Sequence, residues 1–122
     1  DTISSIIDYF NKITEELIDA KKLIKSKNDF LKFISESYLI YQALLFDNNK
    51  VDFAFLQKIF YDLLLNDEIN KKITSQIKYV LIDEYQDTNY IQEQIALKLS
   101  TTQTFVWLEM KINLSIVFVV QR

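Results

Sequence analysis

Two adjacent carboxylates are the residues of this sequence best suited to chemistry. Asp83 and Glu84 directly follow an apolar run, "YVLI" at residues 79–82, and such a run ending in charge predicts a buried strand of a parallel sheet. Open α/β sheets bind ligands beyond the carboxyl ends of their strands. There, one carboxylate can hold magnesium while its neighbour polarises an attacking water. The alternative is an acidic pair that ends a strand and faces solvent.

Composition excludes most other kinds of site. The 122 residues include no histidine, cysteine, glycine or proline. Zinc–thiolate sites, disulfides and imidazole acid–base chemistry are therefore excluded, and so is a phosphate loop built on glycine. Every turn has to be made by Asn, Asp, Ser or Lys. Carboxylates remain as the groups available for chemistry.

Charge and hydropathy limit the partners of the chain. The net charge of −3 gives no overall field that would attract nucleic acid, so any DNA contact is expected to be local. No stretch approaches the roughly 18 apolar residues of a membrane span. The N-terminal residues do not form a charged-then-apolar signal segment. We therefore expect a cytoplasmic protein with no membrane partner.

Helical spacing of apolar residues predicts about four helices before the carboxylates. Residues 3–24 form one long amphipathic pattern. The string "SKND" at residues 26–29 then offers a cap for a second helix that ends near Phe46. The turn signal "DNNK" at residues 47–50 precedes a third helix in "VDFAFLQKIFYDLLLND", residues 51–67. Its predicted apolar stripe consists of Phe53, Leu56, Ile59, Phe60, Leu63 and Leu64. A short fourth helix is predicted over residues 68–76.

The pattern after residue 78 is that of an α/β segment. Asn89 and Gln92 resemble a capping pair for a helix. Its predicted apolar positions are Ile91, Ile95, Leu97 and Leu99. Two further strands are expected at "TFVWL" and "LSIVFVV", and an unpaired "VFVV" edge would allow self-association. We thus expect an α/β fold, with a mostly helical part over residues 1–78 and a partial parallel-sheet core over residues 79–122.

One string carries a family resemblance. "VLIDEYQDTNYIQ", residues 80–92, resembles the magnesium-binding motif of the UvrD/Rep family of superfamily 1 DNA helicases, which reads D-E-Y-Q-D-T-N at a strand end with a Gln three residues further on. Upstream, "VDFAFLQKIFYDLL" resembles the segment that precedes this motif in the family. The resemblance covers about residues 38–100. It implies a fragment of the first motor domain, a P-loop NTPase core, with the preceding helices belonging to an inserted subdomain.

The resemblance also assigns roles to individual residues. Asp83 would be the magnesium ligand and Glu84 the base that activates water for ATP hydrolysis, while Gln86 would lie near the nucleotide and couple its state to DNA. The implied cofactors are Mg²⁺ and ATP. The implied partners are DNA and the remaining helicase domains, and the implied activity is ATP-dependent translocation and unwinding of DNA, with a role in DNA repair.

DNA contacts within the helical part would involve lysines. A solvated helix face explains these residues at least as well. The candidates are Lys21, Lys22, Lys25, Lys27, Lys71 and Lys72.

The chain also departs from the family pattern. Without glycine it has no phosphate loop, and the G-D-x-x-Q motif expected downstream is absent from residues 100–122. We therefore expect that these 122 residues alone do not hydrolyse ATP. Two alternatives remain open: a non-enzymatic helical interaction module with a remnant motif, and a recombination nuclease-helicase, where Phe often stands in place of Tyr85.

Overall fold

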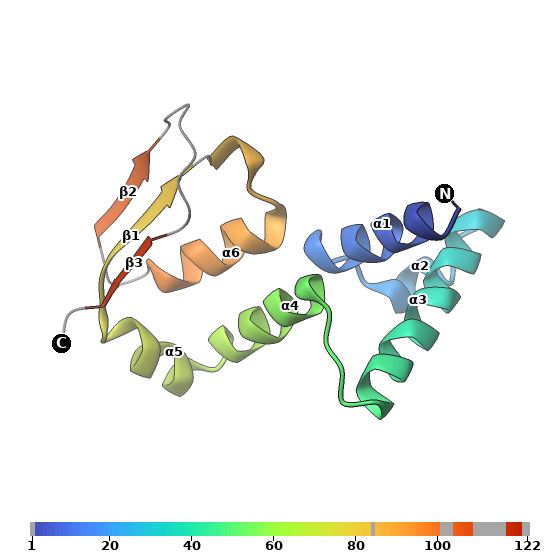
Figure 1. Cartoon of the computed structure of the whole chain (residues 1–122), viewed down its shortest axis with the longest axis horizontal. Helices are drawn as coiled ribbons and strands as arrows, with labels where there is room; N and C mark the ends of the chain where they lie inside the picture. The colour runs from blue at the N-terminus through green and yellow to red at the C-terminus, as the bar shows by residue number, and fades with distance from the viewer. Residues whose placement is uncertain (1, 84, 101–103, 109–116, 121–122) are drawn as a thin grey trace. The chain divides into compact units, whose positions relative to one another are not determined.

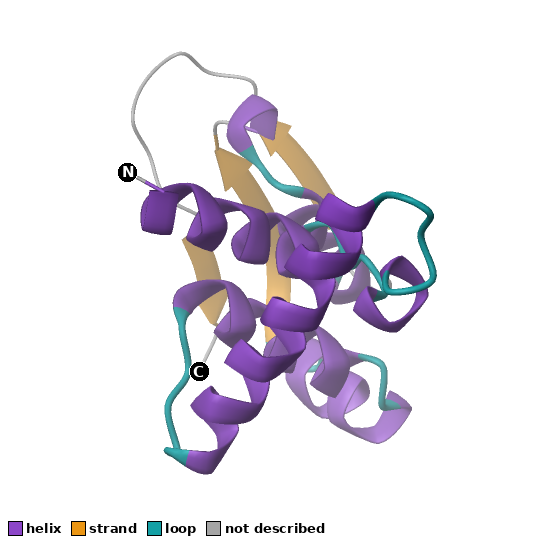
Figure 2. Ribbon diagram, turned by 90° about the vertical axis from the view of Figure 1, so that its right-hand side faces the viewer, coloured by secondary structure: helices purple, strands orange, loops and turns teal. Residues whose placement is uncertain are grey.

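The structure is a computed structural model that describes residues 2–83, 85–100, 104–108 and 117–120. Helix is the dominant structure among them (Figure 2). The chain divides into two compact units, Asp1–Lys58 and Ile59–Arg122. Each unit has a hydrophobic core of its own. The division falls inside a helix, and the subdomain boundary predicted near residue 78 stays a prediction.

The first unit is helical. It contains α1 (Thr2–Glu15), α2 (Ala20–Leu23), α3 (Asp29–Asp47) and the beginning of α4 (Phe53–Leu64), which are drawn from blue to green in Figure 1. Its core takes apolar side chains from α1, α2 and α3. The buried members are Phe10, Ile13, Ala20, Ile34 and Tyr38. Among the described residues, no helix of either unit has the length and hydrophobicity needed to cross a bilayer.

The single long helix predicted over residues 3–24 is wrong, because α1 ends at Glu15. Leu17 follows with a φ of 53°, in the left-handed region. Its N–H donates to the Thr14 carbonyl at 3.1 Å, and the Ile18 N–H donates to the Ile13 carbonyl at 2.9 Å. These two bonds form a Schellman motif, which satisfies the last carbonyls of a helix. The turn lets Ala20 enter the core, where its carbonyl accepts the Ser35 hydroxyl at 2.5 Å.

The predicted cap and turn around α3 are confirmed. Asn28 accepts the N–H groups of Phe30 and Leu31, so "SKND" starts the helix as expected. Within "DNNK", Asn49 has a φ of 50° and closes a second Schellman motif, in which the Lys50 N–H donates to the Leu45 carbonyl at 2.8 Å. Asn tolerates the left-handed region better than most residues, so it takes the place that glycine usually fills.

Asn49 yields a stability prediction. Replacing it with alanine should lower the free energy of unfolding by about 1 kcal/mol, because a Cβ without a compensating polar side chain disfavours positive φ. Replacing it with glycine should not destabilise the chain. Urea unfolding followed by circular dichroism measures both changes. Lys50→Ala, at an exposed neighbouring residue whose φ is not positive, serves as the control and should change stability by less than about 0.5 kcal/mol.

Two tyrosines of α3 make polar contacts within the first unit. The Tyr41 hydroxyl donates to Asp52 Oδ2 at 2.6 Å, while Asp52 Oδ1 accepts the Phe55 N–H at 2.6 Å and so caps α4. Burial, followed by the hydrogen bond to Asp52, raises the pKa of Tyr41 to about 12. The Tyr38 hydroxyl lies 2.9 Å from Thr14 Oγ1 and accepts the Gln42 side-chain amide at 2.6 Å. Burial raises the pKa of Tyr38 as well.

The Tyr41–Asp52 bond predicts a loss of stability in alkali. The neutral phenol is favoured in the folded state, whereas the unfolded chain ionises it near its ordinary value of 10.0. The contribution of this bond is therefore complete below pH 10 and is lost as the pH rises towards about 12. Tyr41→Phe should cost about 1 kcal/mol at neutral pH and show a shallower decline above pH 10. Unfolding curves at several pH values measure both effects.

Tyr9→Phe is the matched control for this experiment, because Tyr9 is an exposed residue of α1. It should follow the wild-type pH profile. If Tyr41→Phe declined in alkali as steeply as that control, the proposed linkage would be wrong.

The second unit combines helices with a small sheet. It continues from the end of α4 through α5 (Asp67–Thr74), β1 (Ile77–Asp83), the short 3-10 helix η1 (Tyr85–Asp87), α6 (Tyr90–Leu99), β2 (Thr104–Leu108) and β3 (Val117–Val120). The spatial order is β2-β1-β3 (Figure 1). The strand predicted at "TFVWL" is present, and so is the last part of the one predicted at "LSIVFVV", whose residues 114–116 lie outside the described part. Within residues 2–76, all of them described, five helices and not about four precede β1.

These three strands do not form the parallel sheet that was predicted. β1 pairs with β2 in parallel, with Asp83 opposite Leu108, but it pairs with β3 antiparallel. The physical reason is the length of the connections. A parallel pair needs a crossover of a dozen or more residues, which α6 supplies between β1 and β2. Residues 109–116 between β2 and β3 are too few for a second one.

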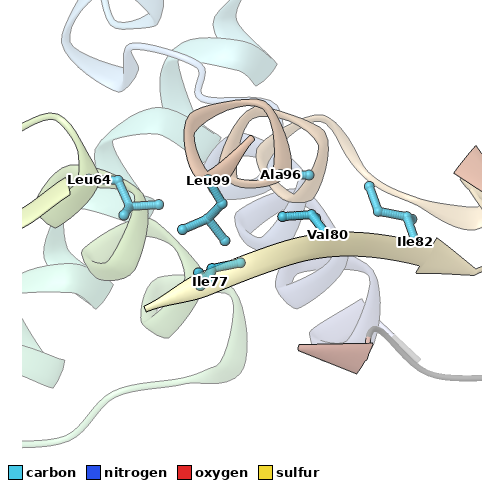
Figure 3. Close-up of a cluster of buried hydrophobic side chains, with 6 residues drawn as sticks. All are labelled: Leu64, Ile77, Val80, Ile82, Ala96 and Leu99. Atoms are coloured by element: carbon cyan, nitrogen blue, oxygen red, sulfur yellow. The ribbon is translucent and has the colours of Figure 1, made fainter. Parts of the chain in front are cut away.

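The core of this unit lies between one face of β1 and the helices. Figure 3 shows Ile77, Val80 and Ile82 on the side of β1 that faces Leu99 of α6. Val80, Ile82 and Leu99 are each only 1% exposed. Ile77 shares this face despite its odd number because the pairing register shifts between Ile77 and Tyr79. Tyr79 is 40% exposed, so the strand that was predicted to be buried is buried only in part.

Two predicted apolar faces also differ from the observed ones. In α6 the buried residues are Ile91, Ala96 and Leu99, whereas Leu97 is exposed. In α4 only Leu64 of the predicted stripe is buried. The exposed members of that stripe are Phe53, Leu56, Ile59 and Leu63.

Candidate functional site

The candidate site begins where β1 ends. Asp83 is the last residue of the strand, and its backbone pairs in parallel with Leu108, the last residue of β2. It therefore stands at the carboxyl end of a parallel pair, the edge at which α/β sheets bind ligands. The Asp83 side chain and the whole of Glu84 lie outside the described residues. The roles that the resemblance assigns to them stay predictions.

Gln86 is placed by η1, the short helix between β1 and α6. It is exposed, and no hydrogen bond from its side chain is found among the described residues. Its backbone is constrained by its neighbours. The Tyr85 carbonyl accepts both the Thr88 N–H, at 3.1 Å, and the Thr88 hydroxyl. The turn is thereby closed around Gln86, while its amide faces solvent.

Tyr85 connects this turn to α6. Its half-buried ring packs against the core of the second unit, and its hydroxyl donates to Glu93 Oε1 in the first turn of α6. The hydrogen bond to Glu93, more than burial, raises the pKa of Tyr85. Sequence reasoning missed this contact, because residues eight apart across a turn follow neither helical nor strand spacing.

The predicted capping pair at the start of α6 is confirmed as a complete capping box. The Gln92 N–H donates to Asn89 Oδ1 at 3.0 Å, and the Asn89 N–H donates to Gln92 Oε1 at 3.2 Å. Two of the free N–H groups at the helix start are satisfied reciprocally. The two residues therefore have a structural explanation that is independent of any ligand.

The described residues contain no cluster of three or more acidic, cysteine or histidine side chains arranged for a metal ion. A magnesium ion bound with a nucleotide does not need one, since it is usually held by one or two carboxylates, water and the phosphates. The donor expected here, a carboxylate at the end of β1, suits a hard cation of this kind.

Only some of the lysines predicted as DNA contacts lie in helices. Lys25 and Lys27 lie between α2 and α3, whereas the others belong to α2 (Lys21 and Lys22) and α5 (Lys71 and Lys72). Lys22 forms an exposed ion pair with Asp19 at 3.9 Å, which contributes little stability. Lys71 and Lys72 lie in the last turn of α5, where positive charge is favoured by the helix dipole. Local structure thus accounts for these three lysines without a nucleic acid.

Comparison with known proteins identifies the family. The profile of the UvrD/REP helicase N-terminal domain matches residues 2–109, nearly the whole chain. The chain belongs to the UvrD/REP helicase family. The resemblance found in the motif is therefore confirmed. No solved structure matches the chain.

Individual relatives of this UvrD/REP chain include helicases of two kinds. A "Probable DNA helicase II homolog" of Mycoplasma capricolum is 41% identical over 80 residues, covering 64% of this chain and 11% of the relative. An "ATP-dependent DNA helicase Rep" of Buchnera aphidicola is 32% identical over 102 residues, covering 82% and 15%. An ATP-dependent helicase/nuclease protein of Listeria monocytogenes is 37% identical over 96 residues, covering 72% and 8%. The chain thus spans a small part of each relative.

The capping box yields a prediction for the second unit. Asn89→Ala should lower the free energy of unfolding by about 1 kcal/mol, because an N–H group at the start of α6 loses its acceptor. Urea unfolding followed by the fluorescence of the single tryptophan, Trp107 in β2, measures the change. Leu97→Ala, at an exposed position of the same helix, is the control. A larger loss for Leu97→Ala than for Asn89→Ala would contradict the structure.

Proposed function

We propose that this chain is part of the first motor domain of an ATP-dependent DNA helicase of the UvrD/Rep type. The observation that carries the proposal is the string "DEYQDTN" at the carboxyl end of a strand in a parallel pair, in a chain that belongs to the UvrD/REP family. The names of its relatives, which include ATP-dependent helicases, support the same activity. The full protein would couple ATP hydrolysis to translocation and unwinding of DNA. Its DNA-repair role and cytoplasmic location stay predictions.

Within that motor, the last residue of β1 and the residues that follow it would have different chemical roles. Asp83 would hold Mg²⁺, which neutralises charge on the nucleotide phosphates when it is bound. Glu84 would accept a proton from the water that attacks the terminal phosphate. Gln86, held in the closed turn of η1 with an exposed side chain, would contact the nucleotide and respond to DNA. The arrangement requires a strand end, a turn and a helix start in succession, and β1, η1 and α6 provide them.

The remaining parts of the site would come from other segments of the full protein. A phosphate loop needs glycine, and the chain has none. The P-loop NTPase core, the DNA-contacting surface and the other helicase domains are therefore proposed for the full protein. Self-association would use β2 or β3, which are the outer strands of the sheet described here.

The proposal predicts different effects of Glu84→Gln in these 122 residues and in the full-length helicase. The 122 residues alone should show no DNA-stimulated ATPase activity above that of their Glu84→Gln variant. In the full-length helicase, Glu84→Gln should lower kcat by about 100-fold or more, because the loss of a general base typically costs that much. A coupled phosphate-release assay with and without single-stranded DNA measures both. Wild-type turnover by the full-length Glu84→Gln variant would overturn the proposal.

A further inference from the structure

The hydrogen bond between Tyr85 and Glu93 is a contact that the family motif alone does not explain. Tyr85 belongs to the turn that follows β1, and Glu93 lies one helical turn into α6. The phenol donates to Glu93 Oε1, so a charged acceptor receives the bond. Hydrogen bonds to ionised groups are shorter and stronger than neutral ones. This bond therefore joins η1, which lies within the family motif, to α6, which follows it.

Other contacts fix the positions of Tyr85 and of Glu93. On the Tyr85 side, the ring packs against the core cluster that contains Val80 and Ile82 of β1, and the backbone carbonyl accepts two bonds from Thr88. On the Glu93 side, the capping box of Asn89 and Gln92 defines the start of α6, and the Glu93 N–H donates to the Asn89 carbonyl at 3.1 Å. A side chain in the first turn of such a helix has a defined direction.

These contacts restrict the backbone position of Gln86. Its neighbour Tyr85 is held by the core, by Thr88 and by α6, so the backbone of η1 has little freedom to rotate about the end of β1. The Gln86 side chain nevertheless is exposed, and no hydrogen bond from it is found in the described part of the chain. A rigid backbone that carries a free polar side chain is what a nucleotide-contacting residue requires, because misplacement by about 1 Å can cost up to 100-fold in rate.

We propose that Tyr85 and Glu93 act as positioning residues: their hydroxyl–carboxylate hydrogen bond holds η1 against α6 and so fixes Gln86 beside the carboxyl end of β1. This inference rests on the proposed function, because it gives Gln86 a nucleotide to meet. The ring and the hydroxyl of Tyr85 have separable roles. The ring packs against the core cluster, which phenylalanine would do equally well, whereas the hydroxyl makes the bond to Glu93 of α6.

The test uses the full-length helicase and compares conservative variants. Tyr85→Phe and Glu93→Ala should each lower the DNA-stimulated kcat by about tenfold, with the KM for ATP changed less than about twofold. The double variant should be no slower than either single variant, because both remove the same bond. Glu93→Gln, which keeps an oxygen acceptor, should recover most of the activity. Tyr90→Phe, at an exposed residue of the same segment, is the matched control and should behave like wild type.

A structural readout accompanies the kinetics. Hydrogen–deuterium exchange of the full-length protein should become faster in the peptide that contains Gln86 and Thr88 when Tyr85 is replaced by phenylalanine. The melting temperature should stay close to that of wild type. Unchanged exchange would mean that the bond does not hold the turn. A kcat loss accompanied by an equal loss in the Tyr90→Phe control would also overturn the inference.

Glu84→Gln, measured in parallel, separates this inference from the proposed function. If Glu84→Gln abolishes turnover while Tyr85→Phe keeps the wild-type kcat, the proposed function stands and the positioning role is overturned. If Glu84→Gln keeps wild-type turnover, the proposed function is overturned, and the inference with it, since Gln86 would then have no nucleotide reaction to support.

Discussion

Burial of one face of β1 beneath α6 is the constraint on which the second unit depends. Val80, Ile82 and Leu99 lose almost all contact with water, and apolar burial is the main driving force for folding. Because α6 is also the connection between β1 and β2, its packing against β1 brings β2 back in parallel. The end of β1 then becomes the carboxyl edge of a parallel pair. Packing of apolar side chains from β1 and α6 thus places the motif at the edge where α/β sheets bind ligands.

The sequence predicts the features that depend on neighbouring residues. A cap within "SKND", a turn at "DNNK", the capping pair of Asn89 and Gln92 and the strand before Asp83 are all present as predicted. Each of these features depends on residues that are close together in the sequence. The motif itself was sufficient to indicate the UvrD/REP family, because seven consecutive residues carry far more information than one carboxylate pair.

The features that the sequence did not predict depend on tertiary contacts. Helical spacing continues across residues 16–19, but packing of Ala20 and the bond from Ser35 favour a break there. The orientation of β3 follows from the length of its connection, which strand patterns do not encode. Tyr85 and Glu93 meet only because a turn folds back on a helix. The roles of Asp83 and Glu84 are predictions from their chemistry and from the family resemblance, and their side chains lie outside the described residues.

Tyrosine–carboxylate bonds recur in this chain where a helix begins. Asp52 caps α4 and accepts the Tyr41 hydroxyl, and Glu93 lies in the first turn of α6 and accepts the Tyr85 hydroxyl. In both bonds, the helix dipole favours a carboxylate at the start of a helix. The same carboxylate holds the tyrosine of a preceding element through a hydrogen bond. In the part of the chain that the structure describes, a tyrosine–carboxylate bond thus links two elements in each compact unit.

Leu17 has a consequence for how the first unit folds. A leucine at positive φ is locally frustrated, since its own preference is to continue the right-handed helix. Asp19 opposes it locally, because its side chain accepts the N–H groups of Lys21 and Lys22 and so starts a new helix, α2. Burial of Ala20 and the bond from Ser35 oppose it from outside the segment. The end of α1 is therefore defined by a cap and by tertiary contacts that together outweigh the preference of one leucine.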